Sequence, residues 1–163
     1  MEIKLEIKNG KLIIYEVNAK YRKYLEKFEF RVSQKDNRKF YGILIKCGKY
    51  KYCIPFTSKV KNRNSKLTIN IKNKDKIIAQ LLLNNMIPVT YKELKIVNIE
   101  EEKYSDYLKS EIIYLNKQEI SKEILRKTKN MFETLENEQN RDYLFFKKLC
   151  CDFKLLEKIY KNY

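Results

Sequence analysis

Histidine and tryptophan are absent from this sequence of 163 residues, and only three glycines and two prolines are present. The absence of histidine excludes the usual general base of neutral-pH catalysis, the Ser-His-Asp and Cys-His nucleophile systems, and HExxH zinc sites. Any catalysis by this protein must therefore depend on Lys, Arg, Tyr, Ser, Thr or carboxylate side chains.

Long apolar runs are also absent. No run reaches the length of about 18 residues that a membrane span requires, and the first ten residues, MEIKLEIKNG, carry charges where a signal peptide needs an apolar stretch. We therefore expect a cytoplasmic protein without membrane contact. The length predicts one domain whose core is large enough to fold without disulfide or metal staples.

The four cysteines show no CxxC spacing, and no histidine is present to complete a zinc set. In a reducing cytosol we expect buried free thiols rather than disulfides. The acidic residues form no DxD or other cluster of the kind that a two-metal nuclease needs. The sequence therefore predicts neither a metal site nor a cofactor.

Positive charge is abundant and unevenly distributed. The chain has 36 Lys+Arg and 21 Asp+Glu, a net charge of +15, and residues 31–80 hold 14 of the basic residues against only Asp36 and Asp75. This is the electrostatic footprint expected for a polyanion partner. An AT-rich coding sequence is the alternative explanation, but that bias would add Glu as readily as Lys, so we favour nucleic acid.

The first hundred residues show strand-like patterns with one short helix. Alternating apolar residues before Asn9-Gly10 and an apolar run after it predict a hairpin over residues 1–16 with a type I′ turn. Asn18 is expected to cap a helix over residues 19–28. Residues 33–38 are polar and predict a loop.

Two β-rich runs, residues 39–47 and 50–56, flank Gly48-Lys49, the pattern of a two-residue hairpin turn with glycine first. We expect Pro55 to end the ladder, because proline donates no hydrogen bond. Further strands are expected at residues 66–72, 77–83, 86–90 and 94–99. Residues 17–100 thus predict a compact, strongly curved antiparallel sheet or barrel.

From about residue 101 the apolar period changes from two to 3.6. Helices are expected over residues 104–115 and, after a capping box formed by Asn116 and Glu119, up to residue 135. A third helical segment runs from residue 144 to 160, with Asp152 as an internal cap. Strands followed by helices, with residues 101–163 as the helical part, predict the α+β class.

A basic loop begins with Thr57, Ser58 and Lys59, directly after the proline-containing strand. Serine and threonine can donate to non-bridging phosphate oxygens, while Lys59, Lys61 or Arg38 could stabilise a dianionic phosphorane. If the substrate is RNA, its own 2′-OH is the nucleophile, so the protein needs only a base, a charge stabiliser and an acid. DNA lacks this hydroxyl and would not be cut.

Tyrosines occur beside lysines, as in Lys20-Tyr21 and in residues 49–52, KYKY. A stacking face next to an ammonium group favours unpaired nucleic acid. On a strand, however, Tyr50 and Tyr52 share one face, so we expect most of these tyrosines to belong to the core.

Four separated segments, in order and spacing, carry a resemblance to a known family: KYRKYLEKFEFRV, RKFYGILIKCGKYKYCIPFTSK, NNMIPV and CDFKLLEKIY. The chain resembles the ToxN/AbiQ family, the endoribonuclease toxins of type III toxin–antitoxin systems, from about Val17 to Tyr160. Residues 1–16 lie outside the resemblance, as an edge decoration or an assembly contact.

The resemblance implies a curved β core similar to that of Kid/MazF toxins, with added helices. It implies metal-independent cleavage of cellular or phage mRNA, typically at adenine-rich sites, that leaves 2′,3′-cyclic phosphate and 5′-hydroxyl ends. It also implies a partner, a small structured antitoxin RNA. The toxin cuts this RNA from a tandem-repeat precursor and is inhibited by it in a closed toxin–RNA assembly, and such systems abort phage infection.

The family's catalytic positions fall on Tyr21, Arg38, Thr57 and Ser58. The family's Thr-Ser-Pro-Lys pattern would place its lysine on Val60, so Lys59, our choice, or Lys61 takes that role. From these positions we hypothesise that Ser58 and Thr57 bind the scissile phosphate, that Arg38 and the lysine stabilise the phosphorane, and that Tyr21 or the lysine transfers protons. We expect RNA contacts from Lys20, Lys23, Lys39, Lys61, Arg63 and Lys66.

Two other functions fit the basic strands and tyrosines. A non-catalytic RNA-binding module would bind RNA and leave it intact. A protein-interaction domain with incidental basicity would bind no RNA even at low salt.

Overall fold

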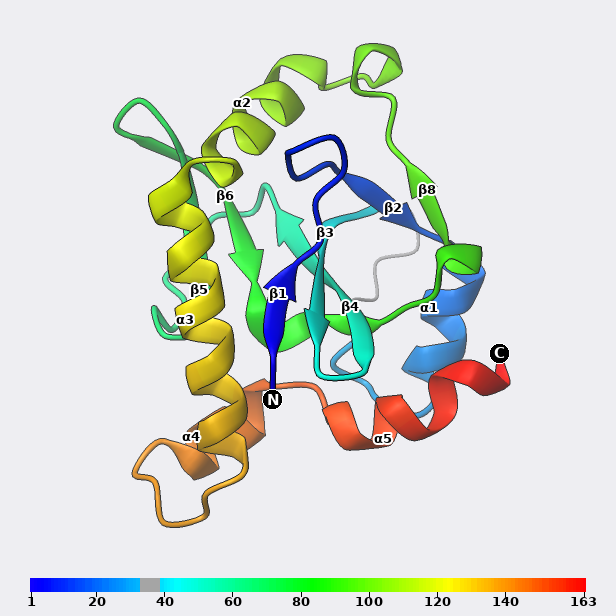
Figure 1. Cartoon of the computed structure of the whole chain (residues 1–163), viewed down its shortest axis with the longest axis vertical. Coiled ribbons are helices and arrows are strands. Elements are labelled where there is room, and N and C mark those ends of the chain that lie inside the picture. Colours follow the sequence, from blue (N-terminus) through cyan, green and yellow to red (C-terminus); the bar gives the residue numbers. More distant parts are fainter. Residues whose placement is uncertain (33–38) are drawn as a thin grey trace.

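An antiparallel sheet of eight strands forms the centre of the computed structural model, which describes residues 1–32 and 39–163 (Figure 1). The strand order is β5-β6-β4-β3-β2-β8, with β1 on β3 and β7 on β4. Within the described residues the two end strands do not pair with each other, so the sheet is not closed into a barrel, which corrects that part of the prediction. The strands are β1 (Ile3–Leu5), β2 (Tyr15–Val17), β3 (Phe40–Cys47), β4 (Tyr50–Thr57), β5 (Thr68–Asn73), β6 (Lys76–Leu82), β7 (Ile87–Pro88) and β8 (Leu94–Ile96).

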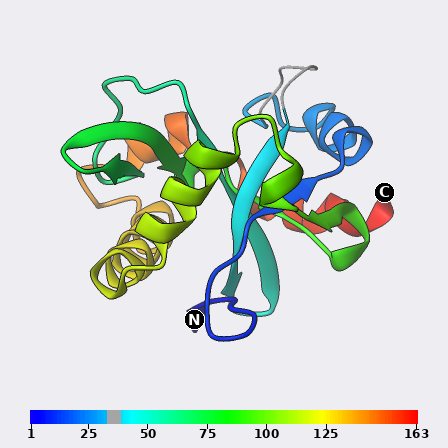
Figure 2. The ribbon, with the colours of Figure 1, turned by 90° about the horizontal axis from the view of Figure 1, so that it is seen from above.

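Helices flank the sheet and confirm the α+β class. Helices α2 and α3 lie on one side of the molecule, whereas α1 and the C-terminus lie on the other (Figures 1 and 2). No helix of the described ranges is long and apolar enough to cross a bilayer. The α-helices are α1 (Ala19–Glu26), α2 (Ser105–Leu115), α3 (Gln118–Leu135), α4 (Tyr143–Leu149) and α5 (Phe153–Ile159), and 3₁₀ turns occupy η1 (Leu83–Asn85), η2 (Tyr91–Glu93), η3 (Ile99–Glu101) and η4 (Tyr160–Asn162).

The β3–β4 hairpin is the central pair of the sheet. Its turn places Gly48 at a φ of +62°, which confirms the predicted turn with glycine first. Pairing with β3 ends at Pro55, opposite Gly42, but β4 continues to Thr57 by pairing with β6. Pro55 therefore ends one ladder and not the strand, because the residues after it pair with a different neighbour.

The N-terminal turn forms as predicted, whereas the hairpin around it does not. Asn9 and Gly10 have φ angles of 54° and 82°, as a type I′ turn requires, and Lys8 and Lys11 form an isolated bridge. The flanking strands β1 and β2 both pair with β3 instead of with each other. Strand β3 is mostly buried, so it offers both short strands more apolar contact than they offer one another.

Two of the three predicted helix caps are present. Asn18 Oδ1 accepts the N–H groups of Lys20 and Tyr21, and the Asp152 carboxylate accepts the N–H of Leu155. The predicted capping box at Asn116 is wrong.

Helix α3 begins after Lys117 without a side-chain cap. The Asn116 amide instead bonds both the N–H and the carbonyl of Leu12, at 2.8 and 3.1 Å. This contact spans more than a hundred residues, so the local pattern could not reveal it.

The four cysteines are buried and unpaired, as predicted. Burial raises the pKa of the Cys47 and Cys150 thiols to about 12. These thiols therefore remain protonated at neutral pH and act as small apolar side chains of the core.

Gly42 provides a test of the β3–β4 packing. A Cβ atom at this position would overlap the carbonyl oxygen of Ile54 and lie 2.6 Å from Cys53 Sγ. We expect Gly42→Ala to lower the free energy of unfolding by roughly 2 to 3 kcal/mol in urea titrations. Gly10→Ala is the control, because nothing lies within 4 Å of its Cβ and only the left-handed φ costs about 1 kcal/mol. If both variants lose the same free energy of unfolding, the close packing at Gly42 is contradicted.

Glu111 predicts a pH dependence of stability. This α2 side chain is 4% exposed, its Oε2 has no hydrogen-bond partner among the described residues, and burial raises its pKa to about 7. Because the pKa is higher in the folded than in the unfolded protein, protonated Glu111 stabilises the fold. This contribution is fully present below the unfolded pKa of about 4.5 and is lost as pH rises through the folded pKa of about 7.

Glu111→Gln removes this titration. Relative to the wild type, the variant is therefore expected to gain roughly 2 to 3 kcal/mol between pH 4.5 and pH 8, measured by urea unfolding. If the difference between variant and wild type stays constant over this range, Glu111 does not titrate as described.

Candidate functional site

The loop between β4 and β5 holds most of the predicted site residues. Thr57 is the last residue of β4, and Ser58, Lys59 and Lys61 follow on the exposed surface. Thr57 Oγ1 accepts the N–H of Lys59 at 3.1 Å, so its own proton can still be donated to another group. The strand end thus presents two hydroxyl groups within a basic loop.

The side chain of Gln80, on β6, fixes this loop. It is 3% exposed and lies opposite Thr57 in the sheet register. Gln80 Oε1 accepts from the Lys61 N–H at 3.1 Å and from Arg63 Nε at 2.8 Å, and its Nε2 donates to the Lys61 carbonyl and to Asn70 Oδ1, both at 2.9 Å. All four hydrogen-bonding positions of one buried amide are therefore used, three of them on the loop.

Helical residues hold the second half of the loop. Lys127 Nζ, on α3, donates to the carbonyls of Ser65 and Thr68 at 2.6 and 2.9 Å. Lys66 Nζ lies 2.5 Å from the carboxylate of Asp142, and this lysine lowers the pKa of Asp142. The loop is thus tied to the sheet at one end and to the helical region at the other.

A polar cleft of about 560 Å³ lies beside the loop. Tyr114 contributes an aromatic ring to its wall, and Glu123 is the one carboxylate among the described lining residues. The cations of the wall are Lys61, Arg63, Lys72 and Lys127. This excess of positive charge suits a polyanion.

The start of β3 lies next to the end of β4. Because Gly42 pairs with Pro55 in an antiparallel register, the chain before Gly42 runs alongside the chain after Pro55. This places Lys39 on the side of the sheet that ends in Thr57. Arg38 immediately precedes Lys39 and lies outside the described residues.

Lys39 is exposed and shares a carboxylate with Tyr41. The Tyr41 hydroxyl donates to Glu102 at 2.8 Å and Lys39 Nζ lies 3.1 Å from the same carboxylate, and both lower the pKa of Glu102. The carboxylate thus holds the Lys39 side chain near the start of β3.

Three predicted residues lie on α1. Lys20 and Lys23 are exposed. Tyr21 is fully buried, its hydroxyl donates to the carbonyl of Pro88, and burial raises its pKa. The structure therefore brings Thr57, Ser58 and the loop cations together, whereas the Tyr21 hydroxyl faces the interior.

Four residues of the site were not predicted from sequence: Gln80, Lys72, Tyr114 and Lys127. For two of them, the sequence does contain a pattern that could have indicated their role. Gln80 is a single polar residue in the apolar run IIAQLLL, and Lys127 lies on the apolar face of α3, three residues after Ile124. A polar residue in an apolar pattern indicates a specific buried partner.

Comparison with known proteins identifies the family. The sequence profile described as "Toxin ToxN, type III toxin-antitoxin system" matches residues 13–161. The chain belongs to this ToxN toxin family. It is 30% identical over 158 residues to the Endoribonuclease ToxN of Bacillus thuringiensis subsp. kurstaki, which covers 90% of this chain and 81% of that protein. As a ToxN toxin, the protein is an endoribonuclease.

Solved structures agree with this family. A toxin of a bacterial type III toxin–antitoxin system, selectively inhibited by a non-coding RNA pseudoknot, matches with a TM-score of 0.82 and 27% identity over 94% of this chain and 98% of that one. AbiQ, a lactococcal anti-phage endoribonuclease of a type III system, matches with a TM-score of 0.77 and 26% identity over the same shares. Both likenesses extend over nearly the whole ToxN fold.

Replacement of Gln80 tests whether it positions the loop. Gln80→Leu removes all four hydrogen bonds, so we expect trypsin to cut after Lys59, Lys61 and Arg63 at least tenfold faster and RNA cleavage to fall at least tenfold. The melting temperature reports folding separately. The exposed Gln118, changed to Leu, is the control. A folded Gln80→Leu protein that cuts RNA at the wild-type rate would exclude this positioning role.

Proposed function

We propose that this ToxN toxin cleaves RNA at the β4–β5 loop without a metal ion, by attack of the substrate's 2′-OH on the adjacent phosphate. The observation that carries the proposal is the pair Thr57 and Ser58 at the end of β4, within a cationic loop that Gln80 fixes. The 2′-oxygen bonds to phosphorus and the 5′-oxygen leaves. The products are a 2′,3′-cyclic phosphate and a 5′-hydroxyl.

The two hydroxyl groups are assigned to the scissile phosphate. Ser58 is exposed, and the Thr57 hydroxyl retains its proton while it accepts the Lys59 N–H. Both can donate to non-bridging oxygens as the phosphorane gains charge, and Arg38 with a loop lysine offsets that charge. Fixed donors cost little reorganisation at the moment of reaction, which is the benefit of the Gln80 contacts.

Proton transfer is assigned to a loop lysine. The Tyr21 hydroxyl is enclosed and already donates to Pro88, so we give Tyr21 the role of holding α1 against β7. Lys59 is the first choice for removing the 2′-proton and Lys61 the alternative, and a protonated loop lysine donates the proton that the leaving 5′-oxygen takes up. A lysine suits this role when neighbouring cations lower its pKa.

The cleft beside the loop is the proposed path of the RNA. Lys61, Arg63 and Lys72 line it and would bind successive phosphates, and Lys39 extends the positive surface at the start of β3. Lys66, near Asp142, lies at the far end of the loop. Lys20 and Lys23 would contact RNA from α1.

The partner is proposed to be a small structured RNA. One structural relative is inhibited by a non-coding RNA pseudoknot. By analogy, an RNA cut by this toxin from tandem repeats would occupy the cleft, cover Ser58 and inhibit the enzyme in a closed toxin–RNA assembly. When that RNA is lost, cellular or phage mRNA becomes the substrate in the cytoplasm. Defence against phage is the biological role, as for AbiQ.

Ser58 is the direct test of the site. Ser58→Ala is expected to lower the cleavage rate of a labelled single-stranded RNA at least a hundredfold in EDTA, because a phosphate donor is lost. Ser105→Ala is the control, since Ser105 lies at the start of α2 and is not among the residues that line the cleft. Lys59→Ala and Lys61→Ala identify the lysine by the larger loss. Wild-type cleavage by Ser58→Ala, or a requirement for a divalent cation, would contradict the proposal.

A further inference from the structure

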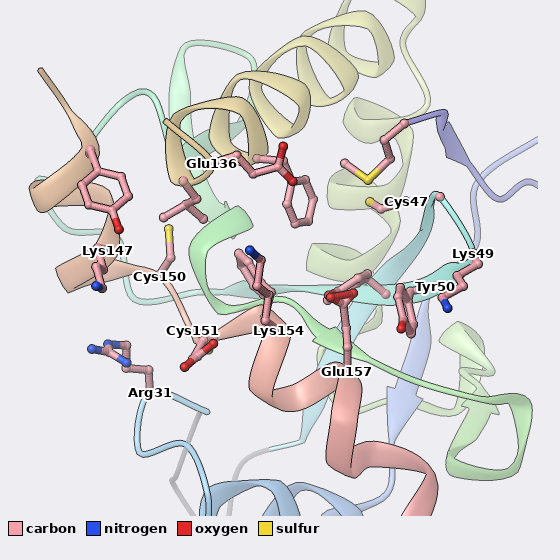
Figure 3. Close-up of a pocket in the computed structure, with 18 residues that line it drawn as sticks. Arg31, Cys47, Lys49, Tyr50, Glu136, Lys147, Cys150, Cys151, Lys154 and Glu157 are labelled. Atoms are coloured by element: carbon pink, nitrogen blue, oxygen red, sulfur yellow. The ribbon is translucent and has the colours of Figure 1, made fainter. Parts of the chain in front are cut away.

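A second cavity, of about 480 Å³, lies at the other end of β4 (Figure 3). The β3–β4 hairpin, α3, α4 and α5 surround it. Tyr52, in its wall, is six residues before Ser58, which corresponds to roughly 20 Å along an extended strand. The cavity is therefore separate from the proposed cleavage site.

Three aromatic rings form one wall of this cavity. The ring centroids of Tyr52 and Phe153 are 5.7 Å apart, those of Phe132 and Phe153 are 5.3 Å apart, and those of Tyr52 and Phe132 are 6.2 Å apart. The three rings belong to β4, α3 and α5, so the packing of three elements fixes them. Such a wall favours a planar, partly apolar ligand.

Two polar groups lie against the aromatic wall. The half-buried Glu157, on α5, reaches into the cavity beside Lys154 (Figure 3). The Tyr52 hydroxyl is buried and interacts with the Glu157 carboxylate. Burial, and then the Glu157 carboxylate, raise the pKa of Tyr52, so its hydroxyl is a proton donor at neutral pH. Tyr52 therefore orients the Glu157 carboxylate, which keeps further acceptor capacity for a ligand.

Cations stand at the mouth of the cavity. Lys49, on the hairpin turn, and Lys154, on α5, are both exposed and approach from different sides (Figure 3). Both favour the charged form of Glu157, whose pKa burial raises. The cavity thus combines an aromatic wall, carboxylates and cations, and Glu157 is the carboxylate that lies against the aromatic rings; Glu136 and Asp152 also line the cavity.

We propose that this cavity binds an unpaired guanine nucleotide. Guanine is the one common base whose Watson–Crick edge offers two adjacent donors, N1–H and N2–H, beside an acceptor, O6. The Glu157 carboxylate, oriented by Tyr52, would accept both donors, and Lys49 with Lys154 would meet O6 and the phosphate. Adenine and cytosine each offer a single amino donor on that edge, so they fit less well.

The guanine that fits this cavity could belong to a free nucleotide or to an RNA in which it is unpaired. Proteins read splayed RNA bases by stacking and by hydrogen bonds to their edges. The inference goes beyond the proposed function, since it places a second base-binding site away from the cleavage loop.

Calorimetric titration of the full chain with GMP tests the inference. We expect GMP to bind at least tenfold more tightly than AMP. Glu157→Gln should weaken GMP binding at least tenfold, because a donor replaces one acceptor oxygen, and Tyr52→Phe about threefold or more. Glu138→Gln, at an exposed position, is the matched control without effect. No binding at millimolar GMP, or equal binding of AMP and GMP, would overturn the inference.

Competition separates the two sources. In the Ser58→Ala protein, which should not cut RNA, a hairpin RNA with one unpaired loop guanine is titrated against GMP, with the same hairpin carrying adenine as the control. Displacement by the guanine hairpin alone assigns the site to RNA, and binding of GMP without displacement assigns it to a free nucleotide. The Ser58→Ala protein should bind GMP with the wild-type affinity, and a parallel loss of GMP binding would overturn the assignment of a separate site.

Discussion

The change of partner along β4 is the constraint on which both sites of this ToxN toxin depend. Up to Pro55 the strand pairs with β3, and after it with β6. The second pairing puts Thr57 opposite Gln80, whose buried amide then determines the path of the following loop. The first pairing fixes Tyr52 in the core, in the wall of the second cavity. One strand therefore positions chemistry at both of its ends.

The two halves of the chain contribute differently to the cleavage site. The first half carries nearly all of the net charge and both hydroxyl groups. The second half is almost neutral, yet it supplies Lys127 and Asp142, which hold the loop, and Tyr114, which lines the cleft. A basic loop alone would sample many conformations, and its attachment to helices reduces that freedom.

The features predicted correctly from sequence are those decided by neighbouring residues. The Asn18 cap and the turn at Gly48 depend on the backbone of a few residues, and a short pattern therefore contains them. The contacts of Asn116 and Gln80, and the pairing of β1 with β3, join segments that are distant in sequence. Only the packed fold brings these groups together, so a local pattern could not specify their partners.

The central claim is that the RNA itself provides the nucleophile at the Thr57–Ser58 loop. The most direct measurement is cleavage, in EDTA, of an RNA that carries a single 2′-deoxynucleotide on the 5′ side of the scissile phosphate, compared with the all-ribose RNA. The account predicts that the ribose RNA yields a 2′,3′-cyclic phosphate and that the substituted RNA stays intact at that bond. Cleavage of the substituted bond at a comparable rate would contradict it.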